Sequence, residues 1–206
     1  MSEAAPTVFI VDDDPSVRNG LARLVQAAGL RAESFDSAEA FLATGRGKNP
    51  GCVVLDLKMP GMTGTELQQR LEELDCRIPI IFLSAHGNVP AAAVAFKRGA
   101  VDFLVKPVDR DVLLAAIRTS LARDAQQRMS LAERESVSEK LRRLTTRERD
   151  VLRMVISGRL NKQIADELGI IEGTVKIHRA RVMRKLEVES VAELTRLCMR
   201  GGVDPA

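Results

Sequence analysis

Strand-like apolar runs recur five times in the first half of the chain, and four of them end on polar residues suited to a phosphate or metal site. Helical patterns separate the runs, and a strand–helix unit repeated five times builds a parallel sheet with helices on both faces. The runs are residues 7–11, 31–35, 52–55, 79–83 and 101–105, and the polar residues after four of them are Asp12, Asp13, Asp56, Ser84 and Lys106. Because ligands bind beyond the carboxyl ends of such strands, we expect three carboxylates, a hydroxyl and an ammonium to converge at one edge of the sheet.

The composition indicates one or two domains in the cytoplasm. The 206 residues are 45% hydrophobic, no apolar stretch is long enough to span a bilayer, and the start lacks a secretion signal. The cysteines are widely spaced, odd in number and without a CxxC pair, which favours reduced thiols over zinc ligands or disulfides; they are Cys52, Cys76 and Cys198. We therefore expect a cytoplasmic protein that does not contact a membrane.

The two parts of the chain differ in charge and in aromatic content. Residues 1–123 carry 14 Lys and Arg against 15 Asp and Glu, whereas residues 124–206 carry 17 against 13. All six phenylalanines lie in the first part, and the chain contains no Trp or Tyr. Without aromatic side chains the second part cannot stack unpaired bases, so a basic helical unit that contacts the phosphates of a duplex fits better.

The first domain is expected over residues 1–122, followed by a helical linker over 123–143 and a small all-α domain over 144–206. The linker contains neither Gly nor Pro and mostly favours helix, so it is predicted to continue the fifth helix of the first domain. Four short helices are predicted after it: from the capping box at Thr145 to Gly158, from Asn161 as cap through Leu168, from Thr174 through Leu186, and from Ser190 through Met199. The tight turn at Gly169 makes the middle two a helix-turn-helix.

Three crowded carboxylates need a cation. Like charges at Asp12, Asp13 and Asp56 are costly unless a cation lies among them, and hard oxygen ligands with few protein contacts suit Mg²⁺. A carboxylate can also be the nucleophile of phosphoryl transfer, and Asp56, at the end of the central strand, is the expected nucleophile. Lys106 would hold a phosphate oxygen, and the Ser84 hydroxyl would donate a hydrogen bond to the attached phosphoryl group.

Motifs along residues 6–122 resemble the receiver domain of two-component response regulators. They are Val11-Asp12-Asp13-Asp14, Asp56 to Gly64, Ser84-Ala85-His86-Gly87 and Lys106-Pro107. The resemblance implies a strand order of 2-1-3-4-5, phosphorylation of Asp56 by a histidine kinase and a cis Lys106-Pro107 bond. It also implies Mg²⁺ bound by Asp13, Asp56 and the Lys58 carbonyl, with Asp12 acting mainly through water. Ser84 and Phe103 match the switch pair of that family, although Phe103 lacks the hydroxyl of the tyrosine often found there.

The segment 174–185 carries several basic residues and no acidic one. It contains no carboxylate, and its cations are Lys176, Arg179, Arg181, Arg184 and Lys185. Exposed helices usually alternate charge signs, so this run exceeds what solubility needs. A solvated basic face is the alternative interpretation, but apolar residues at helical spacing favour a packed recognition helix; they are Val175, Val182 and Leu186. Its basic side chains would contact phosphates while its exposed first turns read base edges in the major groove.

Residues 141–200 resemble the LuxR-type helix-turn-helix, and together with the receiver motifs they resemble the FixJ branch of the NarL/FixJ response regulators. The motifs are Leu144 to Glu148, Gly158 to Ala165, Gly173 to Arg179 and Val182 to Leu186. The resemblance implies DNA contacts from Thr174, Lys176, Ile177 and Arg179, and dimer pairing through Val191, Leu194 and Cys198. Ile171 stands where this family usually has a short polar cap, a loss that typically costs about 1 kcal/mol. Glu172 or Gly173 would then begin the helix, or it would fray until DNA binds.

These expectations combine into a DNA-binding transcriptional activator controlled by phosphorylation of Asp56, through either dimerisation or release of a masked recognition helix. Its expected partners are a sensor histidine kinase, double-stranded DNA, RNA polymerase and, when phosphorylated, a second copy of the chain. No catalysis is expected beyond self-phosphorylation and self-dephosphorylation at Asp56. An aspartate-nucleophile phosphatase would need a second carboxylate where Lys58 stands, and a flavodoxin-like carrier would need a phosphate-cradling loop after the first strand. RNA binding or protein contact is the alternative output for the second domain.

Overall fold

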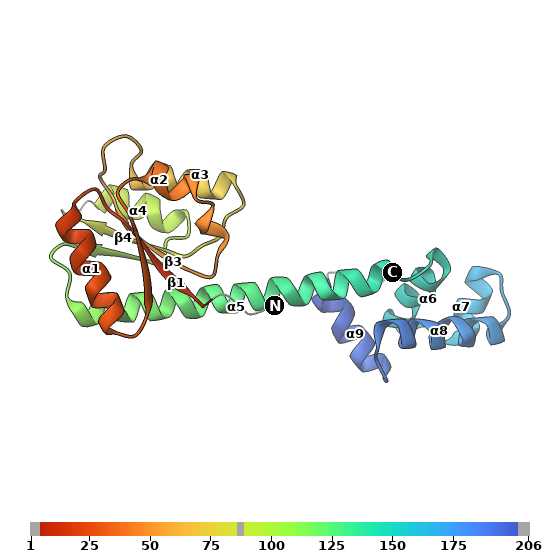
Figure 1. Ribbon diagram of the computed structural model, residues 1–206. Helices are drawn as coiled ribbons and strands as arrows, with labels where there is room; N and C mark the ends of the chain where they lie inside the picture. Colours follow the sequence, from red (N-terminus) through yellow and green to blue (C-terminus); the bar gives the residue numbers. More distant parts are fainter. Residues whose placement is uncertain (1–4, 86–88, 202–206) are drawn as a thin grey trace. The chain divides into compact units, whose positions relative to one another are not determined.

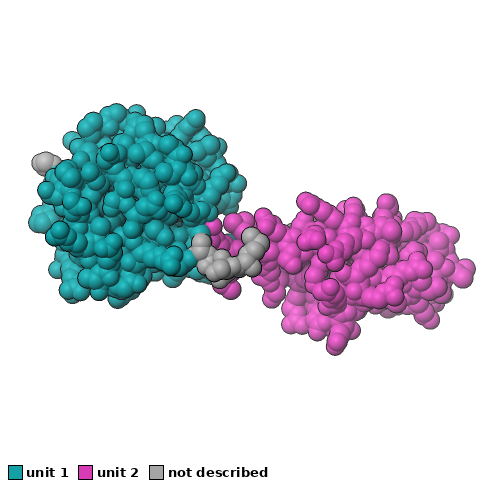
Figure 2. Space-filling view, in the orientation of Figure 1, with its two compact units in different colours: residues 1–127 teal, residues 128–206 magenta. Residues whose placement is uncertain are grey.

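Two units make up the chain, residues 1–127 and residues 128–206 (Figure 2). The computed structural model describes residues 5–85 and 89–201, so His86 and Gly87 of the receiver-like motif lie outside the described residues. The division after Gln127 falls beyond the predicted end of the first domain at Ala122, within a helix that continues into the second unit. Within the two described stretches, no helix combines the length and the apolar character that crossing a membrane requires.

A five-stranded parallel sheet lies at the centre of the first unit (Figure 1). Its strands are β1 (Thr7–Val11), β2 (Arg31–Phe35), β3 (Gly51–Asp56), β4 (Ile80–Ser84) and β5 (Asp102–Val105). They lie in the order β2-β1-β3-β4-β5, which confirms the predicted sheet and its order. The register places Val11 beside Leu55 and Ser84 beside Val105, so that neighbouring strands end close to one another at the same edge.

Helices cover both faces of this sheet, as repeated β-α units predict. They are α1 (Pro15–Ala27), α2 (Ala38–Ala43), the 3-10 turn η1 (Arg46–Lys48), α3 (Gly64–Glu73), α4 (Val89–Lys97) and α5 (Arg110–Arg142). On one face Phe9, Phe41 and Phe82 form a core with residues of α2, α3 and α4. On the other face α1 and α5 pack against Ile10 and Val54. Every residue of β3 is buried, as expected of a central strand covered on both sides.

Short polar side chains begin two of the helices beside the sheet. The Asp14 carboxylate accepts hydrogen bonds from the N–H groups of Ser16 and Val17, and proline occupies the first position of α1. At the start of α3, Thr63 and Glu66 form a reciprocal capping box. These caps fix where each helix leaves the carboxyl edge of the sheet.

The start of β3 is tied to α5. The Gly51 N–H donates to the Asp124 carboxylate at 2.9 Å, and Asp124 is only 4% exposed. A side chain at Gly51 would place its Cβ 2.0 Å from the Thr7 carbonyl oxygen. This end of the central strand therefore admits only glycine and is held to the helix that leads out of the unit.

Within residues 128–201, four helices follow the end of α5. They are α6 (Thr146–Ile156), α7 (Asn161–Leu168), α8 (Glu172–Leu186) and α9 (Val191–Arg200). α5 itself runs without a break to Arg142, so the predicted linker is helical and continuous with the fifth helix. The capping box of Thr145 and Glu148 forms as predicted at the start of α6. Residues from all four helices enclose one apolar core, in which α6 and α7 pack against α8.

The start of α7 differs from the prediction. The start of α8 decides between the alternatives that Ile171 left open. Asn161 is the first residue of α7 and not its cap, because Leu160 stands at the cap position. The Asn161 side chain instead accepts a hydrogen bond from Arg179 at 2.7 Å, which is why it does not cap its own helix. α8 begins at Glu172, and Ile171 before it makes no side-chain cap hydrogen bond.

Candidate functional site

The polar residues predicted from the strand ends come together around one cavity of about 370 Å³. Its lining includes Asp12, Asp13, Asp56, Lys58, Ser84 and Lys106. β1 leads directly into Asp12, while Asp56 and Ser84 are the last residues of β3 and β4. The cavity therefore lies at the carboxyl edge of the sheet, beside the central strand.

Lys106 bridges the two buried carboxylates of this cavity. Its Nζ donates to Asp12 Oδ2 at 2.6 Å and to Asp56 Oδ1 at 2.5 Å. Burial raises the pKa of Asp56 above its ordinary value, although the hydrogen bond and charge of Lys106 oppose that shift. Burial also lowers the pKa of Lys106, but its hydrogen bonds to both carboxylates outweigh this effect and leave its pKa raised. The buried Asp56 carboxylate thus lies against the positively charged Lys106 ammonium.

Backbone N–H groups orient the remaining carboxylate oxygens. The Asp14 N–H donates to Asp12 Oδ1 at 2.9 Å, and the Lys58 N–H donates to Asp56 Oδ2 at 2.7 Å. Arg18 Nη1 donates to the Asp12 carbonyl oxygen at 2.7 Å and so holds the loop after β1. Both oxygens of Asp56 are therefore fixed, one by an ammonium and the other by the backbone.

Donors for a divalent cation surround the cavity without forming a closed cage. Across residues 5–85 and 89–201, no three His, Cys, Asp or Glu side chains are grouped closely enough to enclose a metal ion. Asp13 is exposed, and Lys106 already bonds to both Asp12 and Asp56. Carboxylate and carbonyl oxygens around a cavity of this size nevertheless suit Mg²⁺, which keeps several waters and takes few protein ligands.

The two predicted switch residues have different surroundings. Ser84 is 4% exposed and lines the cavity. Phe103 lies on β5, is partly buried and does not line the cavity; its ring packs against Phe82, with centroids 6.1 Å apart. Phe103 contacts β4, whose last residue is Ser84, through this ring packing.

All seven residues predicted to contact DNA lie on α8, and four of them are exposed. Lys176, Ile177, Arg181 and Arg184 are exposed, and we call these four residues the α8 surface. Thr174 and Arg179 are partly buried. Arg179 Nη1 donates to Asn161 Oδ1, a contact that fixes the guanidinium beside α7.

Lys185 is partly buried and pairs with an interior carboxylate, so it does not belong to the α8 surface. Its Nζ lies 2.6 Å from Glu148 Oε2, whose side chain is 3% exposed, and it also donates to the Arg143 carbonyl oxygen at 3.1 Å. Burial raises the pKa of Glu148, but hydrogen bonds from Lys185 and Thr145 outweigh it and leave that pKa below its ordinary value. The sequence marks Glu148 only as part of a capping box, so its pairing with a distant lysine could not be found there.

Two residues of the predicted dimer helix are not available for pairing, which corrects that prediction. Leu194 and Cys198 are each 1% exposed and lie in the core of the second unit. They occupy the inward face of α9, whereas Val191 and Met199 are 40% and 74% exposed. If two copies of the chain paired through α9, they would therefore have to use the exposed face that carries Val191 and Met199.

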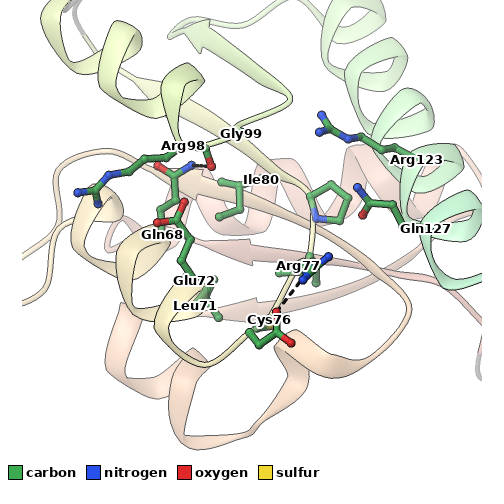
Figure 3. Close-up of a pocket in the computed structure, with 13 residues that line it drawn as sticks. Gln68, Leu71, Glu72, Cys76, Arg77, Ile80, Arg98, Gly99, Arg123 and Gln127 are labelled. Atoms are coloured by element: carbon green, nitrogen blue, oxygen red, sulfur yellow. Dashed lines mark hydrogen bonds and ion pairs between the residues drawn. The ribbon is translucent and has the colours of Figure 1, made fainter. Parts of the chain in front are cut away.

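A further hollow of about 300 Å³ lies at the amino end of β4 (Figure 3). Figure 3 shows Gln68 of α3 and Gln127 of α5 on opposite sides of Ile80, the first residue of β4. Asp75 and Arg77 form an ion pair of 3.1 Å in the loop before that strand. No residue singled out by the strand ends lines this hollow, so the cavity at the carboxyl edge is the candidate site.

Comparison with known families matches both units. The family described as "Response regulator receiver domain" matches residues 8–118. The family described as "Bacterial regulatory proteins, luxR family" matches residues 142–198. Both resemblances drawn from the motifs are thereby confirmed.

Similar proteins extend over nearly the whole chain. The response regulator protein TodT of Pseudomonas putida is 44% identical over 97% of this chain and 88% of its own length. The transcriptional regulatory protein FixJ of Azorhizobium caulinodans is 42% identical over 100% of this chain and 97% of its own length.

Solved structures give the same result. The response regulator StyR, solved at low resolution, is 47% identical over 96% of this chain and 100% of its own, with a TM-score of 0.88. Full-length FixJ from B. japonicum is 39% identical over 96% of this chain and 97% of its own, with a TM-score of 0.59.

Proposed function

The chain belongs to the response regulators that join a receiver domain to a LuxR-type DNA-binding domain, and we propose that phosphorylation of Asp56 by a sensor histidine kinase controls its binding to double-stranded DNA. The observation that carries the proposal is the position of Asp56. It is a desolvated carboxylate at the end of the central strand, with one oxygen on Lys106 and the other on the backbone. Such a group is a suitable nucleophile for phosphoryl transfer.

In the proposed reaction an Asp56 carboxylate oxygen attacks the phosphorus of a phosphohistidine. The new O–P bond forms as the N–P bond breaks, and the histidine nitrogen leaves with the bonding electrons. Lys106, released from the carboxylate oxygen that reacts, then holds a phosphoryl oxygen, and Ser84 donates its hydroxyl hydrogen bond to another. Self-phosphorylation and self-dephosphorylation at Asp56 are the only catalytic steps proposed.

Receiver domains generally use Mg²⁺ for this chemistry. Asp12, Asp13, Asp56 and the Lys58 carbonyl would hold the ion here, with Asp12 acting mainly through water. When bound, it offsets the negative charge of the carboxylate and phosphoryl oxygens. The oxygen donors that line the cavity support this assignment.

The output is regulated DNA binding by the second unit. The phosphoryl group carries about −1.5 to −2 charge, which replaces the charge of about −1 on the free Asp56 carboxylate at the sheet edge. Ser84 moves toward it, Phe103 repacks, and two copies of the chain associate on a two-fold related DNA site. Lys176, Arg181 and Arg184 contact phosphates while Ile177 faces the base edges. We propose an activator that works with RNA polymerase in the cytoplasm.

A comparison of Asp56→Asn with the wild type tests this function. Phosphorylation by a small phosphodonor in Mg²⁺ is followed by mass spectrometry, and binding to duplex DNA is measured in parallel. We expect the variant to take up no phosphoryl group and to show no phosphodonor-dependent gain in DNA affinity. Asp36→Asn, a change of the same kind at an exposed position, serves as the control. Phosphodonor-dependent DNA binding in the Asp56→Asn variant would refute the assignment.

A further inference from the structure

We propose that a hollow between the end of α5 and α6 is where the DNA-bound protein contacts RNA polymerase, through an acidic polymerase segment that carries an apolar side chain. The inference rests on the proposed function as a DNA-bound activator. The hollow has a volume of about 200 Å³ and is lined by Ser138, Leu141, Arg142, Arg149, Leu152 and Arg153. It lies wholly within the second unit, and we call it the arginine hollow.

Three guanidinium groups without acidic partners surround the arginine hollow. Arg142, Arg149 and Arg153 are exposed, and in the part of the chain that the structure describes none of them pairs with a carboxylate. Arg149 donates only to the Arg142 carbonyl oxygen, at 3.4 Å. The adjacent Arg143, by contrast, pairs with Glu139 at 3.0 Å. Three uncompensated positive charges so close together favour an anionic partner.

The floor of the arginine hollow is apolar. Leu152 is 2% exposed and belongs to the core of the second unit, and the partly buried Leu141 packs against that core. DNA phosphates are bound by cations and N–H groups and gain nothing from an apolar floor. A protein segment with one apolar side chain among carboxylates matches both the floor and the rim.

The arginine hollow and the α8 surface lie on different sides of the second unit. α6 packs against the inward side of α8, where Val151, Val175 and Val182 share one core. Arg149 and Arg153, one helical turn apart, lie on the opposite, solvent side of α6. They therefore point away from the α8 surface, toward the solvent from which a second protein would approach.

The test separates DNA binding from transcription in the full chain. R149E/R153E is compared with wild type and with R134E/R196E, which makes the same charge change at two other exposed arginines of the second unit. A DNA site is first selected by the wild type from random duplexes. Affinity for this site, its salt dependence and the urea midpoint of each protein are then measured, followed by transcription from the site with purified RNA polymerase holoenzyme.

We expect R149E/R153E to bind the site within about twofold of wild type, with the same salt slope, and to lose about tenfold in transcript. R134E/R196E and the charge-conserving R149K/R153K should transcribe like the wild type. A reduced salt slope for R149E/R153E would mean that these arginines contact DNA phosphates, and an unchanged transcript level would mean that the polymerase docks elsewhere; either result overturns the inference. A wild type that binds no duplex would refute the proposed function itself.

Discussion

Lys106 Nζ lies 2.5 Å from Asp56 Oδ1, so a cation of the protein's own already offsets the charge of the proposed phosphoacceptor. The same ammonium also bonds to Asp12, the other buried carboxylate of the cavity. An added cation must therefore share these oxygens with Lys106. The site balances attraction of Mg²⁺ by carboxylates against repulsion by the lysine.

Removing this lysine should strengthen magnesium binding. In Lys106→Met both carboxylates lose their cation, so Mg²⁺ faces less repulsion, and we expect its affinity to rise by about tenfold. Isothermal titration calorimetry measures the change. Lys58→Met is the matched control, because the Lys58 side chain is exposed while its backbone groups stay in place. Weaker Mg²⁺ binding in Lys106→Met would show that the ammonium assists the ion.

The raised pKa of Asp56 gives a pH dependence with a definite sign. The folded state holds this proton more tightly than the unfolded chain, so the associated stability is present below the ordinary pKa and is lost as pH rises through the raised value. Asp56→Asn does not titrate, so we expect its free energy of unfolding to rise relative to that of the wild type as the pH increases from below the ordinary carboxyl pKa through the raised value. Urea unfolding without Mg²⁺ measures it. A difference independent of pH would contradict the prediction.

Two cations of α8 should behave differently when neutralised. Arg181→Gln removes an exposed charge of the α8 surface, so DNA affinity should fall and the salt slope should drop by about one. Lys185→Gln instead strands the buried Glu148 carboxylate and should cost about 2 kcal/mol of unfolding free energy. Urea unfolding and salt-dependent DNA binding separate the two effects. Equal stability losses would mean that Lys185 has no structural role.

Supplying the missing cap of α8 should stabilise the second unit. Ile171 is 75% exposed, so its replacement sacrifices little apolar burial. In Ile171→Ser the hydroxyl can accept a hydrogen bond from an N–H of the first turn, and we expect a gain of about 1 kcal/mol. Ile171→Ala, which cannot cap, is the control in the same denaturation experiment. Equal stability of the Ser and Ala variants would exclude a capping effect.

Glycine at the start of β3 should not be replaceable. Gly51→Ala would bring a Cβ to 2.0 Å from the Thr7 carbonyl and disturb the N–H bonded to Asp124, so we expect a loss of about 3 kcal/mol or more. Gly20→Ala, in the open middle of α1, should instead stabilise by about 0.5–1 kcal/mol. Thermal unfolding of both variants gives the comparison. If Gly51→Ala were tolerated, the amino ends of β1 and β3 would have to be able to move apart.

Local patterns predicted the fold of the receiver domain and the cavity residues well. Strand-like apolar runs located the five strands, and the parallel order then places Asp12, Asp56 and Ser84 at one edge without further information. The Thr145 cap was equally visible, because it depends on a residue only three positions away. Short-range chemistry is therefore sufficient for this part of the molecule.

The predictions that failed concern residues whose roles depend on contacts with residues far away in the chain. Asn161 looks like a cap, but its amide bonds to Arg179 of a later helix. Leu194 and Cys198 look like a pairing stripe, yet the same spacing serves to bury α9 against its own domain. Periodicity identifies an apolar face without saying what covers it, and only the tertiary structure distinguishes a core from an interface.

The strand order leaves β2 and β5 at the edges of the sheet, where unpaired backbone groups could recruit further strands. β2 carries Arg31 and Glu33, which place charges along its length, and β5 has only four residues and begins at the acidic Asp102. Both devices oppose the addition of another strand. The ends of the sheet are thus protected against the uncontrolled edge-to-edge growth that leads to aggregates.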